Sequence, residues 1–214
     1  MDFDKEYFSK YYSDYFKQNP PYKLKSYLNL LLKHVNHGVL LDIGCSYGLF
    51  VEIANEHFTC YGMDMDFDVV SEAGKRVPHA SFLTGILPNI PLKYVNVITL
   101  LDVIEHVADL ETTFGALKDI LRPRGVVLVV VPVYDGPLGW LVKKLDVDST
   151  HIHKCSRTFW LNLTQNYFDL VEWKGVFRRL LFRKYYLHLT TSLLRRMSPA
   201  IIIVLRKKNE KQYE

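Results

Sequence analysis

The segment from Val39 to Asp64 holds acidic and small residues whose types and spacing suit the binding of a ribose-containing ligand. Gly44 follows directly after an apolar run, and a small residue at such a turn lets the backbone approach a ligand closely. Asp64 comes 20 residues after Gly44. This is close to the spacing expected between the first glycine of a nucleotide-binding turn and the carboxylate that accepts the ribose hydroxyls.

The elements that must position these residues can be predicted from the same segment. The run 39–43 is short, apolar and bounded by glycine, as a buried parallel strand is, and residues 49–54 continue with helical periodicity. A second strand ends at Asp64. The segment therefore predicts the first strand–helix–strand unit of a nucleotide-binding sheet.

The composition of the turn argues against a dinucleotide ligand. A dinucleotide-binding turn has the pattern G-x-G-x-x-G, and its three glycine positions are here Gly44, Ser46 and Leu49. Because two of the three glycines are missing, binding of a pyrophosphate is disfavoured.

Three segments carry a family resemblance. Residues 42–48, Asp-Ile-Gly-Cys-Ser-Tyr-Gly, resemble motif I (D-x-G-C-x-x-G) of the class I S-adenosylmethionine-dependent methyltransferases. Residues 95–107 are similar to that family's fourth strand and following turn, and residues 121–132 to its turn into strand five. The resemblance spans about residues 39–176 and fits best the small-molecule branch that includes quinone-biosynthesis methyltransferases. It implies an α/β fold, a Rossmann-like seven-stranded, mostly parallel sheet with helices on both faces.

The resemblance also implies S-adenosylmethionine as cofactor, with S-adenosylhomocysteine as product. In this interpretation Gly44 and Cys45 face the methionine part, Asp42 reaches the amino group and Asp64 holds the ribose hydroxyls. The full set of residues expected at the cofactor is Asp42, Gly44, Cys45, Ser46, Gly48, Asp64, Met65, Gly85, Ile86, Leu101 and Asp102.

Two positions depart from the family pattern. Ser46 replaces the middle glycine of motif I, and Ile86 stands where the family commonly has an acid for the adenine amino group. Loss of that one hydrogen bond is expected to weaken cofactor binding by about 0.5–1.5 kcal/mol.

Methyl transfer from a sulfonium is an in-line displacement, for which alignment and desolvation supply most of the acceleration; a general base can assist an oxygen or nitrogen acceptor. The candidate bases are His106, His151 and His153. The alternative for His106 is a structural residue at the start of the next helix. His151 and His153 are alternate residues, which face the same side of an extended segment. Their spacing could suit a metal, but no carboxylate motif accompanies it, so we expect no metal site.

Asn19-Pro20-Pro21-Tyr22 reproduces a tetrapeptide with which amino-methyltransferases of adenine and glutamine bind planar amides. In those enzymes it follows strand four, a position that Leu101-Asp102-Val103 takes here. We interpret the tetrapeptide as a helix stop.

The composition fits one cytoplasmic enzyme domain. The chain has 214 residues, of which 49% are hydrophobic and 23% are charged. The N-terminus is acidic, no apolar run is long enough to span a membrane, and the three cysteines lack C-x-x-C spacing, so we expect a reducing cytoplasm.

The charge is unevenly distributed along the chain. Residues 151–214 hold 13 Lys and Arg against 4 Asp and Glu, a net charge of +9 against −5 for residues 1–150. This basic region is either a solvated face or a contact for an anionic substrate, nucleic acid or lipid headgroup.

A single domain over residues 1–214 is expected, with an N-terminal helical lid or cap (1–36), a cofactor-binding half (37–132) and a substrate-side half (133–214). Helices are predicted at 5–17, where aromatic residues recur with a helical period, and at 22–34, 67–76, 109–121 and 156–166. Further strands are predicted at 81–84, 95–101, 126–131, 168–176 and 201–205, and a loop at 133–155. The acceptor pocket is expected between the aromatic helix and segment 132–157, beyond the carboxyl ends of the strands.

The sequence thus predicts an S-adenosylmethionine-dependent methyltransferase with a small acceptor, whose identity lies in variable loops. Two alternatives stay open. One is a nucleic-acid or protein methyltransferase that docks through the basic C-terminal region, and the other is a non-catalytic module that binds the cofactor.

Overall fold

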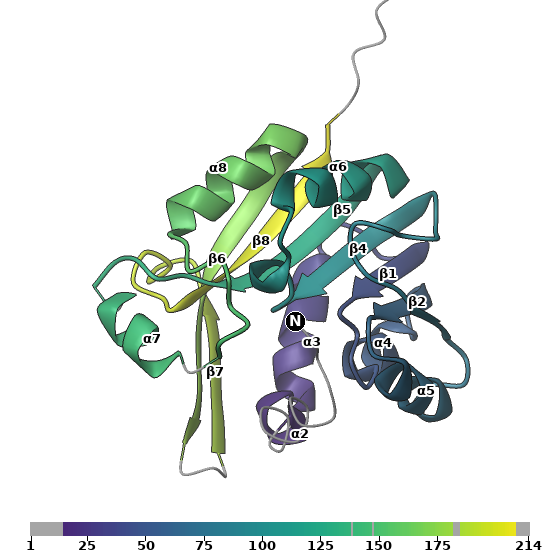
Figure 1. The fold of residues 1–214 in the computed structure, drawn as a ribbon, viewed down its shortest axis with the longest axis horizontal. Coiled ribbons are helices and arrows are strands. Elements are labelled where there is room, and N and C mark those ends of the chain that lie inside the picture. The colour runs from purple at the N-terminus through teal and green to yellow at the C-terminus, as the bar shows by residue number, and fades with distance from the viewer. Residues whose placement is uncertain (1–14, 138, 147, 182–184, 209–214) are drawn as a thin grey trace, which may run out of the picture.

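The centre of the molecule is one eight-stranded sheet (Figure 1). The computed structural model describes residues 15–137, 139–146, 148–181 and 185–208. The strand order is β3-β2-β1-β4-β5-β8-β6-β7, with parallel pairing from β3 to β5 and antiparallel pairing in β5–β8, β8–β6 and β6–β7. The strands are β1 (Val39–Ile43), β2 (Thr59–Asp64), β3 (Ser81–Thr84), β4 (Val95–Leu101), β5 (Leu121–Pro132), β6 (Phe168–Leu181), β7 (Tyr185–Thr191) and β8 (Ala200–Lys207).

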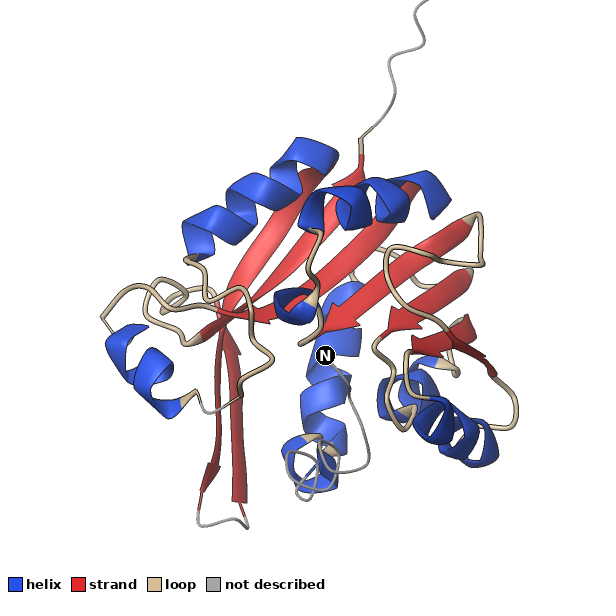
Figure 2. Ribbon diagram, viewed as in Figure 1, coloured by secondary structure: helices blue, strands red, loops and turns tan. Residues whose placement is uncertain are grey.

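Helices cover both faces of this sheet (Figure 2). α3 and α4 contribute to the apolar core on one face, and α6 and α8 to the core on the other. Among the described residues, none of the helices has the length and apolarity that crossing a membrane requires. The helices are α2 (Tyr15–Gln18), α3 (Pro21–Leu31), α4 (Leu49–Ala54), α5 (Phe67–Arg76), α6 (Leu110–Ile120), α7 (Gly139–Leu145) and α8 (Arg157–Tyr167), with a 3₁₀ turn η1 (Ile104–His106).

Strand β5 shows why the central strands are continuously apolar. Val126 and Leu128 belong to the core that α3 and α4 cover, whereas Val127 and Val129 belong to the core that α6 and α8 cover. Successive residues of a strand point to opposite faces, so both sets must be apolar when both faces are buried. The valine-rich run after Gly125 follows from this requirement.

Side chains fix the starts of three helices. The capping residues are Asp66 for α5, Asp109 for α6 and Ser156 for α8, and each accepts the backbone N–H of the residue three positions later. Such caps satisfy amides that have no partner inside the helix. The caps also fix the ends of three connecting segments: the one after β2, the one after β4 and the one that precedes α8.

The predicted α/β class with helices on both faces is confirmed, whereas the predicted count of seven strands is wrong. Strand β6 was expected to end at Val176, but it runs on to Leu181 and returns as β7. Residues 168–176 of β6 pair with β8 and residues 175–181 pair with β7, so this hairpin projects beyond the sheet edge (Figure 1). The hairpin mixes basic, aromatic and aliphatic residues, among them Arg178, Tyr186 and His188, and so lacks the continuous apolar pattern of a core strand.

Two further expectations need comment. The segment 133–155 was expected to be a loop, but it contains the helix α7. The aromatic helix expected at 5–17 falls mainly on residues 1–14, which lie outside the described residues. Its last part is α2, which ends before Pro20, as the interpretation of the tetrapeptide as a helix stop requires.

Candidate functional site

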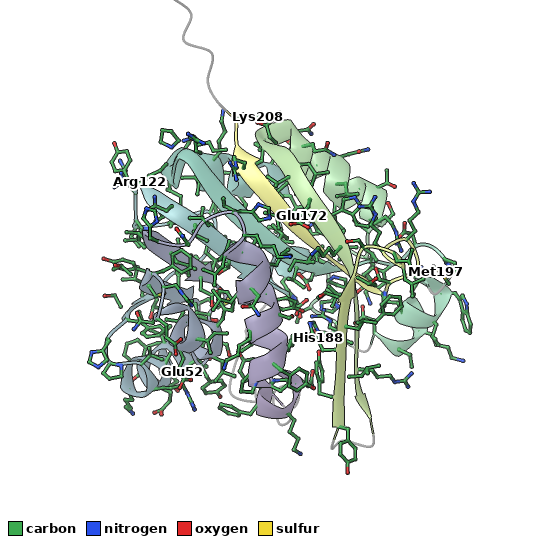
Figure 3. The ribbon with its side chains drawn as sticks, turned by 180° about the vertical axis from the view of Figure 1, so that it is seen from behind. Glu52, Arg122, Glu172, His188, Met197 and Lys208 are labelled. Carbon is green, nitrogen blue, oxygen red and sulfur yellow. The ribbon has the colours of Figure 1, made fainter. Side chains whose placement is uncertain are left out.

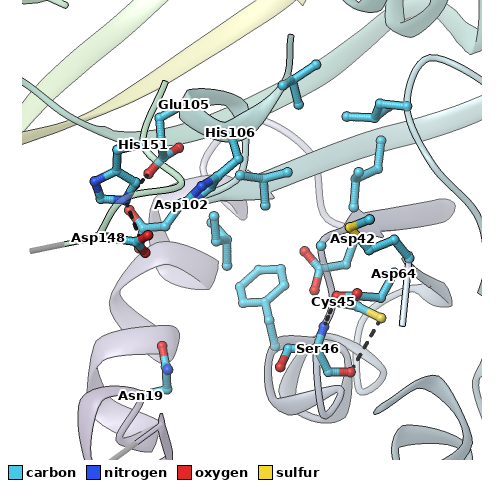
Figure 4. Close-up of a pocket in the computed structure, with 18 of the residues that line it drawn as sticks. Asn19, Asp42, Cys45, Ser46, Asp64, Asp102, Glu105, His106, Asp148 and His151 are labelled. Atoms are coloured by element: carbon cyan, nitrogen blue, oxygen red, sulfur yellow. Dashed lines mark hydrogen bonds and ion pairs between the residues drawn. The ribbon is translucent and has the colours of Figure 1, made fainter. Parts of the chain in front are cut away.

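A cavity of about 1170 Å³ lies at the carboxyl ends of β1, β2 and β4 (Figure 4). Its lining comes from these strand ends, from α2 and α3, from the loop 145–152 and from the β6–β7 hairpin. Strand order reverses between β1 and β4, and in open parallel sheets ligands bind beyond the carboxyl ends at such a point. The cavity is therefore the candidate site.

The turn after β1 brings the backbone to the cavity wall at Gly44. Its φ is 72°, and a Cβ there would lie 2.3 Å from Cγ2 of Val103. Both the conformation and the space require glycine at this position. The N–H groups of Gly44 and Cys45 donate to the carbonyl oxygen of Met63, at 2.7 and 3.1 Å, which ties the turn to the end of β2.

Ser46 occupies the middle position of the turn with a left-handed φ of 47°. Its backbone N–H donates to Oδ2 of Asp64 at 2.9 Å, and Oδ1 of Asp64 accepts the N–H of Asp66 at 3.2 Å. Burial raises the pKa of Asp64, and these amide bonds act in the opposite direction. The carboxylate thus holds the turn in a conformation that serine tolerates, and it also lines the cavity, where a ligand hydroxyl can donate to it.

Asp42, at the end of β1, is a buried carboxyl group beside the cavity. Its side chain is 3% exposed, and its Oδ1 accepts a 2.6 Å hydrogen bond from the hydroxyl of Thr99. Burial raises its pKa to about 7, and the nearby charge of Asp64 adds to this effect. A cationic group of a ligand would stabilise the ionised form of Asp42.

The remaining predicted cofactor residues divide between the cavity and its surroundings. Met65 and Ile86 lie on the exposed rim, and Leu101 and Gly85 also line the cavity. Gly48 stands instead at the start of α4, where its φ of 74° allows the turn into the helix.

Asp102, directly after β4, accepts hydrogen bonds on both oxygens from the guanidinium of Arg178. Desolvation raises the pKa of Asp102, but the charge and hydrogen bonds of Arg178 outweigh it, so the pKa is lowered. Arg178 lies on the part of β6 that was not predicted as strand. The β6–β7 hairpin is thereby joined to the cavity edge of the sheet.

Lys23, on α3, places a buried cation in the cavity wall. The residue is 4% exposed, and its ammonium donates to Oδ1 of Asn19 at 3.0 Å and to the carbonyl of Gln18 at 3.3 Å. Burial lowers its pKa to about 7, and the charge of Arg178 acts in the same direction. An anionic ligand group would favour the charged form of Lys23.

His151, in the loop 145–152, is the histidine of the predicted pair that lines the cavity. Its Nδ1 lies 2.9 Å from Oδ1 of Asp146, whose Oδ2 accepts a 2.7 Å hydrogen bond from the hydroxyl of Tyr134 and lies 2.8 Å from Nζ of Lys154. Desolvation raises the pKa of Asp146, but these bonds outweigh it and lower the pKa to about 2. A carboxylate at Nδ1 assigns the ring proton to that atom, so Nε2 carries the lone pair.

Glu105 and His106, both in η1, lie beside His151 (Figure 4). The ring centroids of His106 and His151 are 4.7 Å apart, and Nδ1 of His106 is 2.9 Å from Oγ1 of Thr150. Glu105 is 1% exposed, and burial raises its pKa well above the ordinary value, with the charge of Asp102 adding to this. The cluster forms one end of the cavity.

His153 has a different environment. Its Nε2 lies 2.8 Å from the carbonyl oxygen of Val107, and its ring lies edge-on to Trp160 with centroids 6.2 Å apart. The backbone N–H groups of Ile152 and His153 donate to the carbonyl of Glu105. These contacts anchor the loop and turn the ring of His153 to a backbone acceptor, while His151 faces the cavity.

Four residues of the site were not predicted as such: Lys23, Glu105, Asp146 and Arg178. Glu105 stood next to a predicted base and matched the family pattern, so a signal was present. The others come from separate elements, and no local pattern marks them.

The comparisons with known proteins identify a family and a fold. A family model described as a methyltransferase domain matches residues 15–171. A search among curated proteins gave no significant match. The fold is similar to a SAM-dependent methyltransferase of Thermotoga maritima, described as a possible histamine N-methyltransferase, with a TM-score of 0.72 and 20% identity over 95% of this chain and 98% of that chain.

Two further structures have the same fold. The N-methyltransferase NodS of Bradyrhizobium japonicum, in complex with S-adenosylhomocysteine, has a TM-score of 0.67 and 16% identity over 91% of each chain. A Haloferax volcanii methyltransferase in complex with the Trm112 activator has a TM-score of 0.72 and 14% identity over 96% of this chain and 98% of that chain. The narrower likeness to quinone-biosynthesis enzymes stays a prediction.

Proposed function

The chain belongs to the methyltransferase-domain family, and from this membership we propose that it transfers a methyl group from S-adenosylmethionine to a small acceptor in the cavity. The observation that carries the proposal is the continuity of the cavity. Asp42 and Asp64 line it at one end, and His151 and Arg178 line it at the other. A donor and an acceptor can therefore lie side by side in one cavity.

The residues at the β1–β2 end fit the cofactor. Asp64 would accept the ribose hydroxyls, Asp42 would pair with the amino group of the methionine part, and the backbone at Gly44 would allow close approach. The raised pKa of the buried Asp42 supports this role, because an ammonium group offsets the cost of its charge. The bound cofactor supplies an electrophilic methyl group on a sulfonium.

The acceptor end supplies alignment and charge. An oxygen or nitrogen acceptor that takes this methyl group would have to lose a proton at this end of the cavity. Nε2 of His151 presents its lone pair at this end. The buried ammonium of Lys23 favours an acceptor that carries an anionic group.

Docking of a nucleic acid or a protein through the basic C-terminal region has less support. Arg178 is directed to Asp102, the guanidinium of Arg157 donates to Asp135, and Lys207 donates to the carbonyl of Leu121. These basic side chains form hydrogen bonds within the protein. The net charge of the region therefore overestimates the number of basic groups that are available to bind an anionic partner.

Calorimetry with S-adenosylhomocysteine tests the cofactor half of the proposal, and mass spectrometry of small molecules that co-purify with the full chain tests the acceptor half. We expect a 1:1 complex with the product and transfer of labelled methyl to a co-purifying compound. Absence of any binding to the full chain would overturn the proposal. Binding without transfer to any co-purifying or screened small molecule would favour the non-catalytic alternative.

A further inference from the structure

Three side chains with metal-ligating atoms converge at the acceptor end of the cavity. Glu105, His106 and His151 each offer a ligand atom, and these atoms all lie within 4.8 Å of one another. Two of the residues come from η1 after β4, and the third comes from the loop 145–152, 46 positions from Glu105. The cluster could not be predicted from sequence spacing, because Glu105 and His151 come close together only in the folded chain.

Glu105 is the least expected member of the cluster. Its side chain is 1% exposed, and among the described residues its Oε2 has no hydrogen-bond partner. Its Oε1 lies 4.0 Å from Nε2 of His151. A buried carboxyl group with an unpartnered oxygen is costly when it is ionised, and binding a cation offsets that cost.

The two histidines are held as metal ligands commonly are. Nδ1 of His151 is bonded to Asp146, which is itself bonded to Tyr134. A ligating histidine usually donates its second ring N–H to a carboxylate, which fixes the tautomer and directs the other nitrogen to the ion. The ring of His106 is similarly held, through Nδ1, by Thr150.

We propose that Glu105, His106 and His151 bind a divalent first-row transition-metal ion at the acceptor end of the cavity. Two imidazoles and one carboxylate suit Zn²⁺ or Mn²⁺, whereas Mg²⁺ and Ca²⁺ prefer oxygen ligands. Around an ion with bonds of about 2.0–2.2 Å the donor atoms lie about 3–3.5 Å apart, so small side-chain rotations close the site. Asp148, with Oδ2 3.8 Å from Nε2 of His151, lies near enough to join.

A general base alone does not account for this arrangement. If His151 acted only as a general base, the His151–Asp146 pair would be sufficient, and neither the buried carboxylate of Glu105 near Nε2 of His151 nor the adjacent ring of His106 would have a role. A bound cation would contact all three side chains. The lone pair on Nε2 of His151 would then bind the metal and would not accept a proton.

The inference rests on the proposed function and narrows the acceptor to a compound with a hydroxyl group. A metal-bound hydroxyl loses its proton more readily than a free one. The O–H bond breaks and the proton passes to water; the oxygen lone pair then forms the O–CH₃ bond while the carbon–sulfur bond breaks with its electrons going to sulfur. No oxidant or reductant is needed.

Titration calorimetry of the EDTA-treated full chain with ZnCl₂ or MnCl₂ tests the proposal, with MgCl₂ for comparison. We expect about one Zn²⁺ or Mn²⁺ per chain and much weaker Mg²⁺ binding. Glu105→Gln and His151→Gln should each weaken binding by about 100-fold or more, since even supporting residues contribute 10- to 100-fold. The control His79→Gln, an exposed histidine that does not line the cavity, should bind within about threefold of the unmodified chain.

No stoichiometric binding of either ion, or equal binding in the unmodified chain and in both ligand variants, would overturn the proposal. Circular dichroism shows whether each variant is folded, and the electron paramagnetic resonance of Mn²⁺ gives a second measure of ion binding that does not depend on heat. S-adenosylhomocysteine affinity is measured in the same samples. Intact affinity without metal binding overturns this inference alone, whereas metal binding without cofactor affinity overturns the proposed function.

Discussion

The guanidinium of Arg178 donates to both carboxylate oxygens of Asp102, and this pair joins the β6–β7 hairpin to the end of β4. Both residues line the cavity. A planar guanidinium matches a carboxylate with two parallel hydrogen bonds, which fixes direction as well as distance. The hairpin, which projects beyond the sheet (Figure 3), is thus held where His188 faces α3 and where its nitrogen Nε2 lies 2.9 Å from Oγ of Ser26.

Replacing Arg178 with Met should destabilise the protein more than replacing both partners of this pair. The single change leaves the carboxylate of Asp102 desolvated without a partner, and we expect the free energy of unfolding to fall by about 1.5–3 kcal/mol. The double change Asp102→Asn with Arg178→Met should recover part of the loss. Urea unfolding measures all three variants, and strictly additive effects would argue against a coupled pair.

Asp64→Asn should lower the affinity for S-adenosylhomocysteine by about 10- to 100-fold, because hydrogen bonds to a charged group contribute about 1.5–3 kcal/mol. The change removes the charge that accepts the amide of Ser46 and that is proposed to accept the ribose hydroxyls. Glu72→Gln, on the exposed side of α5, is the control and should bind as the unmodified chain does. Equal affinity in both variants, measured by calorimetry, would exclude Asp64 from the site.

The turn proposed to hold the cofactor could be predicted because its residues are close in sequence. Asp42, Gly44 and Asp64 belong to one strand–helix–strand unit, whose geometry follows from local periodicity and from a turn that only glycine can make. Ser46 departs from the family pattern, which has glycine at this position. Its backbone N–H donates to Asp64, and this hydrogen bond fixes the conformation of the turn.

The acceptor half could not be predicted in the same way. Arg178 stands 76 positions from Asp102, and in the sequence it looks like one member of a basic cluster. Glu105 and His151 likewise come from separate elements, so the expectation of no metal site rested on spacing alone. The extra strand β7 escaped prediction because a hairpin with one side toward solvent does not need the apolar pattern of a core strand.

Cofactor affinity should rise with pH. Asp42 binds an ammonium group only when ionised, and burial raises its pKa to about 7. Between about pH 6 and pH 8 the affinity for S-adenosylhomocysteine should therefore increase by about 10-fold in the unmodified chain, and Asp42→Asn should bind weakly with little pH dependence. Calorimetry at matched ionic strength gives both profiles, and parallel profiles would contradict the role of Asp42.

The same pKa predicts the pH dependence of stability in the free protein. Between about pH 4 and pH 7 native Asp42 keeps its proton, whereas the unfolded chain has lost it. The native state thus binds more protons at this site, so the contribution of Asp42 to the free energy of unfolding falls as pH rises through this window. Asp64, whose pKa is also raised, contributes in the same direction, whereas Asp102 and Asp146, whose pKa values are lowered, contribute in the opposite direction, so Asp42→Asn should make the slope of the unfolding free energy against pH less negative. An unchanged slope in urea titrations would be the contrary result.

His151→Gln should lower turnover by about 10²–10⁴-fold once an acceptor is known, and cofactor affinity should stay the same. The loss is expected whether His151 acts as base or as metal ligand. His153→Gln should retain turnover within a few-fold, because its ring contacts the backbone at Val107. Equal turnover in the two variants, in single-turnover assays, would assign this loop a role in shape alone.

The N-terminal segment should become more ordered when ligands bind. The Tyr15 and Phe16 rings of α2 each lie 5.4 Å from the ring of Tyr47, which follows Ser46 in the turn after β1. Because Tyr15 and Asn19 also line the cavity, this segment can cover a bound ligand.

Amide hydrogen exchange over residues 15–19 should therefore slow on adding S-adenosylhomocysteine and should slow further with an acceptor, as a lid over residues 1–36 requires. α8, which does not line the cavity, is the internal control, and exchange that changes equally in both segments would indicate general stabilisation in place of a lid. Tyr47→Ala removes the ring that the Tyr15 and Phe16 rings contact, so in this variant S-adenosylhomocysteine should dissociate faster and the protection of residues 15–19 should be lost.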